Sequence, residues 1–316
     1  MKTLLLLIIS ITSPAFSAET DQFMSMDIEL KDMKREVNEV INRLYRQHLQ
    51  VLKISKNASC EKVTLKLGKS FLGLNYNPLK DELLDHKSLV MYPKGIKSMK
   101  KLETYKDTIY ESASRKYPYF RMVPLDPVVN INGIYLSLDK FVHFQGSGYV
   151  YFKKYLKALK KGASHNKAME KGIKWGLSME KGILGLKGSG VLSYADLEAN
   201  FQGMVMYREF CGPNPYIKKN SNGKWFMAKE IDISRYLTPN MDEVFNPSYH
   251  TPRRWKKYIK KDMAKNCYKL NSKVYNSRRA FYRSFNNSYN HTFIHSLRVK
   301  KEVPNNLEHS LNGVCY

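Results

Sequence analysis

Acidic residues are scarce in this sequence. Of its 316 residues, 28 are Asp or Glu and 53 are Lys or Arg, which gives a formal net charge of +25. A charge of this size indicates a polyanionic partner or surface, although it says nothing about the fold. Glycine (17) and proline (12) are too few for a collagen-like or low-complexity chain, and the 43% of hydrophobic residues excludes wholesale disorder.

Long apolar runs are missing after the first residues of the chain. Residues 1–17 combine a positive Lys2, an apolar stretch from Leu4 to Ile11 and small residues before Ala18, which together predict a secretory signal peptide. No later window holds 18 consecutive apolar residues, so we expect no membrane span once the signal peptide is removed. The sequence therefore predicts a periplasmic or secreted protein.

Cysteine is also rare. The four cysteines are Cys60, Cys211, Cys267 and Cys315. An even number in an exported chain predicts two disulfides, with three possible pairings, although buried free thiols are the alternative. Their wide spacing does not resemble a zinc site, which needs close pairs.

The hydrophobic pattern predicts a mainly α-helical fold with minor β structure. At its centre we expect a unit of three helices, over 139–159, 165–180 and 193–210, separated by glycine-rich turns. Ser193, followed three residues later by Asp196, predicts the start of the third helix. The pattern further predicts an amphipathic helix over 27–54, a short strand over 61–67, a connector over 123–138 and a helix over 253–265.

These elements suggest a division of the chain into four parts. They are the signal peptide (1–17), an N-terminal helical region (18–130), a central helical motif domain (131–211) and a basic aromatic C-terminal region (212–316). The last part contains too many aromatic residues for a free tail, so we expect it to pack on the core.

Five polar residues of the central part form the candidate site. Asp139 and His143 are four residues apart, as are Asp196 and Asn200, so each pair shares one helical face. If the helices pack, these four and Glu180 meet in one polar pocket. His143 or Glu180 would then transfer protons, Asp139 and Asp196 would orient or bind cations, and Asn200 would donate hydrogen bonds. The set would suit a divalent metal, but sequence alone leaves the metal and any cofactor unknown.

Each of these residues also has a plain structural interpretation. Asp196 could simply cap its helix, and Asp139 could interact with the dipole at a helix N-terminus. His143 could be a hydrogen-bonded interior histidine, and Asn200 could be a polar surface residue. The recurrence of polar pairs at matching helical spacing favours the site.

The order and spacing of these residues resemble a known family. The motifs are Asp-Lys-x-x-His-Phe at 139–144, Glu180, and Ser-x-x-Asp-x-x-x-Asn-x-x-Gly at 193–203. They resemble the VanZ-like superfamily and the YfiM-type envelope lipoproteins, over residues 139–203 only. The resemblance implies a site at these positions and an envelope compartment rather than a particular reaction. VanZ-like proteins are embedded in membranes, whereas Lys153 and Lys154 interrupt any such span here.

A lysozyme-like peptidoglycan glycoside hydrolase is an alternative. Glu180 would be its general acid, and Asp196 would stabilise an oxocarbenium-like transition state. The position of Asp196 at a helix start, rather than on a hairpin, speaks against this interpretation.

The C-terminal region carries a second candidate surface. Arg253, Arg254 and Trp255 open a stretch over 253–265 in which basic and aromatic residues alternate. Such a surface could bind an anionic envelope polymer, such as peptidoglycan, lipopolysaccharide or a lipid surface. Nucleic acid is a less suitable partner for an exported protein. The alternative is a solvated helix whose aromatic side chains point into the core.

A nearby acidic spot consists of Asp242, Glu243 and Asn246. We interpret these three as turn residues with local ion pairs rather than as ligands of the site.

Together these observations favour an exported cell-envelope protein. Its polar inter-helical pocket would bind or act on an anionic envelope glycan or lipid headgroup. Whether it is an enzyme stays open, and a non-catalytic, basic envelope-binding protein is a further alternative.

Overall fold

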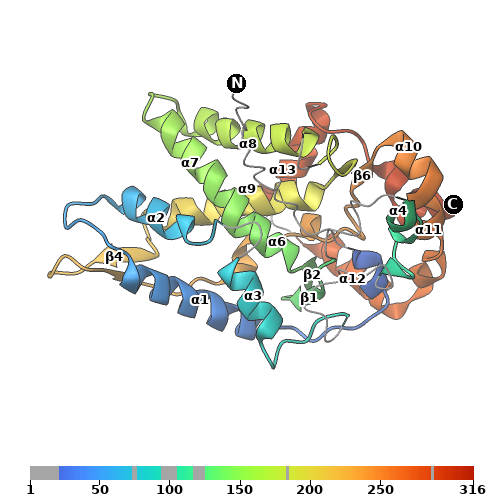
Figure 1. The fold of residues 1–316 in the computed structure, drawn as a ribbon, viewed down its shortest axis with the longest axis horizontal. Coiled ribbons are helices and arrows are strands. Elements are labelled where there is room, and N and C mark those ends of the chain that lie inside the picture. The colour runs from blue at the N-terminus through green and yellow to red at the C-terminus, as the bar shows by residue number, and fades with distance from the viewer. Residues whose placement is uncertain (1–20, 73–76, 94–104, 117–124, 183–184, 286–287) are drawn as a thin grey trace, which may run out of the picture.

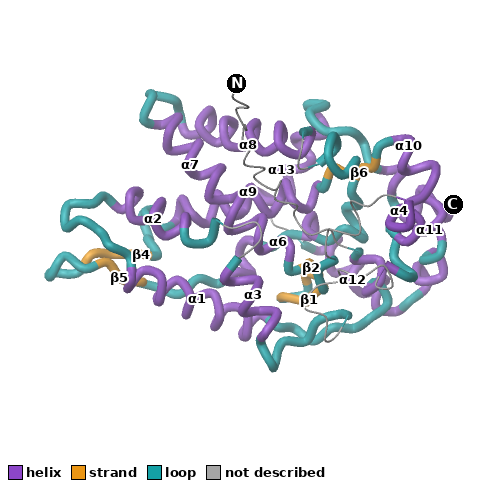
Figure 2. The backbone as a smooth tube through the Cα atoms, viewed as in Figure 1, coloured by secondary structure: helices purple, strands orange, loops and turns teal. Residues whose placement is uncertain are grey.

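The computed structural model describes residues 21–72, 77–93, 105–116, 125–182, 185–285 and 288–316. Helices make up most of these ranges, and strands occur in them as three short antiparallel pairs (Figure 2). The predicted fold class is therefore confirmed. The predicted signal peptide lies outside the described residues.

The helices of the first two thirds of the chain include those that carry the site. They are η1 (Gln22–Ser25), α1 (Lys34–Val51), α2 (Cys60–Lys69), α3 (Pro78–Asp85), α4 (Glu111–Lys116), α6 (Asp139–Val142), the π-helical η3 (His143–Ser147), α7 (Gly148–Leu159), α8 (His165–Lys181) and α9 (Tyr194–Glu209). Because α6, η3 and α7 follow one another without a break, they form the first helix of the predicted three-helix unit.

The remaining helices are short, apart from two. They are η4 (Ile233–Tyr236), η5 (Pro239–Met241), α10 (Pro252–Arg254), the π-helical η6 (Trp255–Ile259), α11 (Lys260–Ala264), η7 (Cys267–Asn271), α12 (Lys273–Ser284), α13 (Ser288–Val299), η8 (Leu307–His309) and α14 (Leu311–Cys315). The strand pairs are β1 (Val128–Ile131) with β2 (Ile134–Ser137), β3 (Val191–Leu192) with β6 (Tyr249–His250), and β4 (Ile217–Lys219) with β5 (Trp225–Met227).

The predicted three-helix unit is present, and α7 packs against both α8 and α9 (Figure 1). The start of α9 is capped as expected, because the Asp196 backbone N–H donates to Ser193 Oγ at 3.1 Å. Glycines bring the helices into backbone contact. A Cβ atom on Gly203 would lie 1.8 Å from the Phe144 carbonyl oxygen, so only glycine allows α9 to approach η3 this closely.

The strand expected over 61–67 is wrong, since these residues belong to α2. Val63 and Leu67 are both buried and lie one helical turn apart, and the side chain of Ser59 caps the helix start. Val63 and Leu67 share a face in a strand and in a helix alike, and so short a stretch does not separate the two.

Two other boundaries also differ from the expected ones. The connector predicted over 123–138 contains the β1–β2 hairpin, which turns at Asn132 and Gly133 with positive φ angles of 53° and 81°. The helix predicted over 27–54 begins only at Lys34. It packs in the main core, as expected from its apolar face.

All four cysteines form disulfides, as predicted. Cys60 pairs with Cys211, which ties α2 to the residue just beyond α9. Cys267 pairs with Cys315, which ties η7 to the end of α14. These pairings join segments 151 and 48 residues apart in the sequence.

The C-terminal region packs on the rest of the chain, as expected. In the main core, Phe201 of α9 stacks on Phe293 of α13 with ring centroids 4.2 Å apart. A second core joins Phe23 and Met26 from the N-terminal part to residues of η6, α11 and α14. Within the described ranges, no helix combines the length and hydrophobicity needed to cross a membrane.

Candidate functional site

Four of the five predicted site residues converge in the interior, where α6 and η3 meet the first turns of α9. His143 Nε2 lies 3.3 Å from Asp196 Oδ2 and 3.7 Å from Asp139 Oδ1. On the other side of the imidazole ring, Nδ1 lies 3.1 Å from the side-chain oxygen of Asn200. Both ring nitrogens are therefore held, which fixes the orientation of His143.

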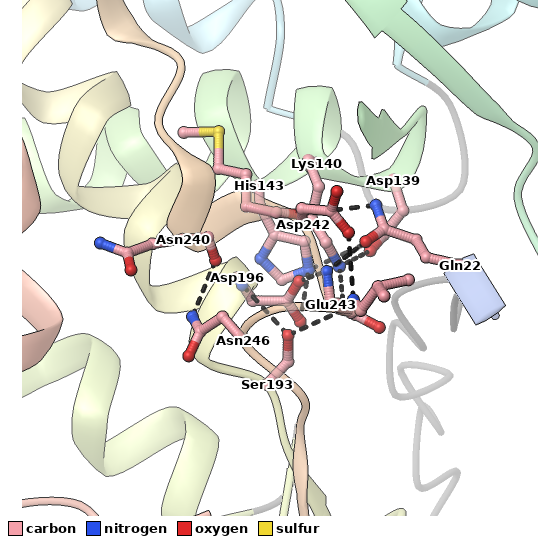
Figure 3. Close-up of polar contacts among 12 residues, drawn as sticks. Gln22, Asp139, Lys140, His143, Ser193, Asp196, Asn240, Asp242, Glu243 and Asn246 are labelled. Carbon is pink, nitrogen blue, oxygen red and sulfur yellow. Dashed lines mark hydrogen bonds and ion pairs between the residues drawn. The ribbon is translucent and has the colours of Figure 1, made fainter. Parts of the chain in front are cut away.

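Two residues that the sequence analysis did not assign to the site complete it. The Lys140 ammonium contacts Asp196 Oδ1 at 2.6 Å, Glu243 Oε1 at 2.8 Å and Asp139 Oδ2 at 2.9 Å (Figure 3). Lys140 belongs to the Asp-Lys-x-x-His motif. Several buried carboxylates need a positive counter-charge, and this requirement is the signal that could have identified Lys140 as a site residue. We call Asp139, Lys140, His143, Asp196, Asn200 and Glu243 the polar cluster.

Glu243 lies in a turn, as expected, but the prediction that its ion pairs are local is wrong. Its carboxylate reaches Lys140 across the interior and also accepts a hydrogen bond from Ser193 Oγ at 3.3 Å. Gln22 fixes its backbone, because the Gln22 side-chain oxygen accepts from the Glu243 N–H (Figure 3). Residues far apart in the sequence thus meet at this carboxylate.

The two neighbours of Glu243 have other partners. Asp242 pairs with the buried Arg278 and accepts a hydrogen bond from the Tyr282 hydroxyl at 2.8 Å. The side-chain oxygen of Asn246 accepts from Arg298 at 2.6 Å. These residues anchor the C-terminal helices α12 and α13 beside the polar cluster rather than joining it.

Burial and mutual attraction oppose each other in the polar cluster. Burial alone would raise the pKa of Asp139, but the charges of Lys140 and His143 hold this pKa below its ordinary value. Burial would likewise lower the pKa of Lys140, yet the surrounding carboxylates raise it well above its usual range. For Glu243, burial prevails and raises the pKa to about 7. The carboxylates outnumber the one ammonium group, so Glu243 is harder to ionise.

Glu180, the fifth predicted residue, is buried near the end of α8. Tyr151 lies between Glu180 and the polar cluster electrostatically: its hydroxyl is 3.5 Å from Asn200 Nδ2, and the charge of Glu180 acts on the same hydroxyl. Burial, and to a lesser degree the charges of Glu180 and Asp196, raise the pKa of this hydroxyl. Asp196 lies in the first turn of α9 and not on a hairpin, so the arrangement expected of a lysozyme-like enzyme is not the one found.

The predicted basic surface divides into buried and exposed residues. Trp255 is only 6% exposed and packs against His309 with ring centroids 4.2 Å apart, so its ring does not form a binding surface. Arg254 lies against Gly190, where a Cβ atom would come within 2.7 Å of the arginine side chain. Arg253 is exposed. It shares the basic face of α10, η6 and α11 with other exposed residues, namely Lys256, Lys257, Lys260 and Lys261.

The polar cluster reaches solvent only at its edge. Asp196 is its most accessible acidic member, with 12% of the side chain exposed, against 6% for Glu243 and 1% for Asp139. A cavity of about 480 Å³ at the end of α8 is lined by Lys174, Lys181, Lys187 and Glu302 among others, and by no residue of the polar cluster. Asp196 is therefore the carboxylate of the polar cluster that is most accessible to solvent.

The polar cluster can act chemically in two ways. A fixed imidazole between carboxylates can move a proton, and carboxylate oxygens facing an imidazole nitrogen can hold a cation. Searches for similar proteins do not narrow this choice, because no family model, curated protein or solved structure matches the chain.

Proposed function

We propose that this chain is an exported protein of the cell envelope that binds or acts on an anionic envelope glycan or lipid headgroup at the polar cluster. The observation that carries the proposal is the convergence of Asp139, His143, Asp196 and Glu243 around Lys140. The resemblance to the VanZ-like superfamily points to Asp139, His143 and Asp196 and to the same compartment.

The energetics of the polar cluster favour a functional role. Burying several charges costs several kcal/mol per ion before attraction is counted, and apolar residues often fill such a space with equal or greater stability. Glu243 keeps a carboxylate in the interior although burial raises its pKa to about 7. Carboxylates and bases with shifted pKa values concentrate at functional sites.

His143 is the proposed proton-transfer group. Its ring is oriented by Asn200 on one side and by Asp196 on the other, as a general acid or base requires. Asp196 lies at the solvent-facing edge and would be the first member of the polar cluster that a ligand meets. Lys140 would keep Asp139 ionised.

An anionic ligand also needs attraction, which the polar cluster alone does not supply because its carboxylates outnumber its ammonium group. The exposed basic face of α10, η6 and α11 supports this part of the proposal. The first helix of this basic face, α10, begins two residues after β6. Strand β6 pairs with β3, and β3 directly precedes α9 in the sequence. This arrangement would draw a polyanion towards the end of α9 that holds Asp196.

The compartment is part of the proposal. Two disulfides suit an oxidising environment such as the periplasm or the extracellular space. The predicted signal peptide at 1–17 agrees with export.

The test uses the chain from residue 18 onward, with disulfides formed. Co-sedimentation with anionic phospholipid vesicles and with peptidoglycan sacculi measures binding, and mass spectrometry of the supernatant detects released products. We expect binding or product release by the native chain and at least a tenfold loss in His143→Gln. The control Glu39→Gln changes an exposed carboxylate on α1 and should match the native chain.

Two results would contradict the proposal. One is the absence of binding and of products with every anionic substrate. The other is unchanged behaviour of a folded His143→Gln variant. A Glu180→Gln variant separates the glycosidase alternative, because only that mechanism requires Glu180 to donate a proton to a glycosidic oxygen.

A further inference from the structure

We propose that Asp139, His143 and Asp196 bind one divalent transition-metal cation of the zinc type. The inference rests on the proposed function, because it concerns the same polar cluster, and it names the means by which that cluster would hold an anionic group. The donor atoms would be Asp139 Oδ1, His143 Nε2 and Asp196 Oδ2.

The spacing of these donor atoms fits a single small cation. One ligand atom from each of the three residues lies within 4.8 Å of the other two. His143 Nε2 is 3.3 Å from Asp196 Oδ2 and 3.7 Å from Asp139 Oδ1. Tetrahedral ligands at zinc distances of about 2.0–2.2 Å lie about 3.4 Å from one another. A cation could therefore be bound with small side-chain adjustments.

Lys140 does not compete for these atoms, because the two carboxylates divide their oxygens. Lys140 contacts Asp139 Oδ2 and Asp196 Oδ1. The other oxygen of each carboxylate, Asp139 Oδ1 and Asp196 Oδ2, faces His143 Nε2. Lys140 thus orients both carboxylates through the oxygens that do not face His143. Groups that contact metal ligands without touching the metal commonly act in this way.

Asn200 fixes which nitrogen of His143 is available. The Asn200 side-chain oxygen lies 3.1 Å from Nδ1, while Asn200 Nδ2 faces the Tyr151 hydroxyl, an arrangement that suits an N–H group at Nδ1. Metal-binding histidines almost always donate their second ring N–H to such an acceptor. Nε2 is then the ring nitrogen that faces the two carboxylate oxygens and is available to a cation.

Such a cation would reconcile an acidic centre with an anionic ligand. Three protein ligands leave at least one coordination position open, as in catalytic zinc sites. Asp196 places that part of the site closest to solvent, with 12% of its side chain exposed. A phosphate or carboxylate oxygen of the ligand could bind there directly.

Isothermal titration with Zn²⁺, repeated with Mn²⁺ and Mg²⁺, tests the inference on the disulfide-bonded chain from residue 18 onward. We expect one equivalent of Zn²⁺ to bind, and Asp139→Asn and Asp196→Asn to weaken this binding at least 100-fold. Each Asn can keep a neutral carbonyl oxygen for Lys140, while it replaces the other oxygen with an amide NH2 and removes the carboxylate charge. The control Glu39→Gln should bind as the native chain does.

Co²⁺ absorption provides a second readout. A site of His nitrogen and carboxylate oxygens should give d–d bands with the native chain that His143→Gln abolishes, with unchanged circular dichroism as the criterion of folding. The absence of one-equivalent binding by the native chain, or binding that the folded Asp variants leave unchanged, would overturn the inference.

Failure of this inference can be distinguished from failure of the proposed function. If metal does not bind but His143→Gln still abolishes ligand binding, the metal site alone is wrong. If metal binds as expected but no anionic envelope ligand does, the metal site stands and the proposed function is wrong.

Discussion

Replacing Gly203 with Ala should separate the helices that form the polar cluster. Gly203 lies one turn after Asn200 on α9 and faces the backbone of η3. An added Cβ would lie 1.8 Å from the Phe144 carbonyl oxygen and 3.1 Å from the Gly148 Cα atom. Because an ordinary contact of a Cβ atom is 3.4 Å or longer, the two segments would have to move apart by about 1.6 Å.

This displacement should cost stability and disrupt the site together. Overpacking a core typically costs about 1–3 kcal/mol, and here the opposing atoms are backbone atoms that no side-chain rotation can move. We therefore expect Gly203→Ala to lower the free energy of unfolding by about 3 kcal/mol or more. A shift of that size also exceeds the range of the 3.1 Å contact between His143 and Asn200, since the two residues lie on the separating segments.

Gly146 provides the matched control, because it is also a buried helical glycine of the same region. The nearest atom to a Cβ at this position is the Phe71 carbonyl oxygen at 3.7 Å, an ordinary contact. Ala favours helices over Gly by about 1 kcal/mol, so Gly146→Ala should be neutral or stabilising. Urea denaturation measures both variants. A Gly203→Ala variant within about 1 kcal/mol of the native chain would refute this account of helix packing.

Three further predictions concern other parts of the chain. Lys140→Met leaves the carboxylates of the polar cluster without their ammonium partner and should cost about 3–5 kcal/mol in urea denaturation. Burial raises the pKa of Glu198 to about 7, so its stabilising protonated form is lost as pH rises from about 4.5 through 7. Between pH 4.5 and pH 8, the free energy of unfolding of Glu198→Gln should therefore rise by about 3 kcal/mol relative to that of the native chain. Urea denaturation at each pH measures this difference. Replacing Cys267 and Cys315 with Ser removes the disulfide that links residues 48 positions apart. This change should lower the free energy of unfolding by about 4 kcal/mol.

The elements best predicted from the sequence are those with local signals. The central helices were predicted because glycines and a capping serine mark their ends, and Ser193 indeed accepts the Asp196 N–H. Residues 61–67 were mispredicted because their apolar alternation is too short to separate a helix from a strand. The Asn132–Gly133 dipeptide was an available hairpin signal that the connector prediction over 123–138 did not use.

The polar cluster was only partly predictable, because part of it depends on long-range packing. Helical spacing correctly paired Asp139 with His143 and Asp196 with Asn200. No local pattern indicates that Glu243, about 100 residues beyond Lys140, ends 2.8 Å from it. The contact depends on how the segment after η5 folds over the start of α9, which the whole packed chain determines.

The central claim is that the polar cluster is a metal-binding site rather than a purely structural one. Crystals of the chain from residue 18 onward, grown with Zn²⁺ and measured at the zinc absorption edge, test it most directly. The account predicts an anomalous peak within about 2.0–2.2 Å of Asp139 Oδ1, His143 Nε2 and Asp196 Oδ2. A map without a peak at these atoms under saturating Zn²⁺, with the His143 and Lys140 contacts unchanged, would contradict it.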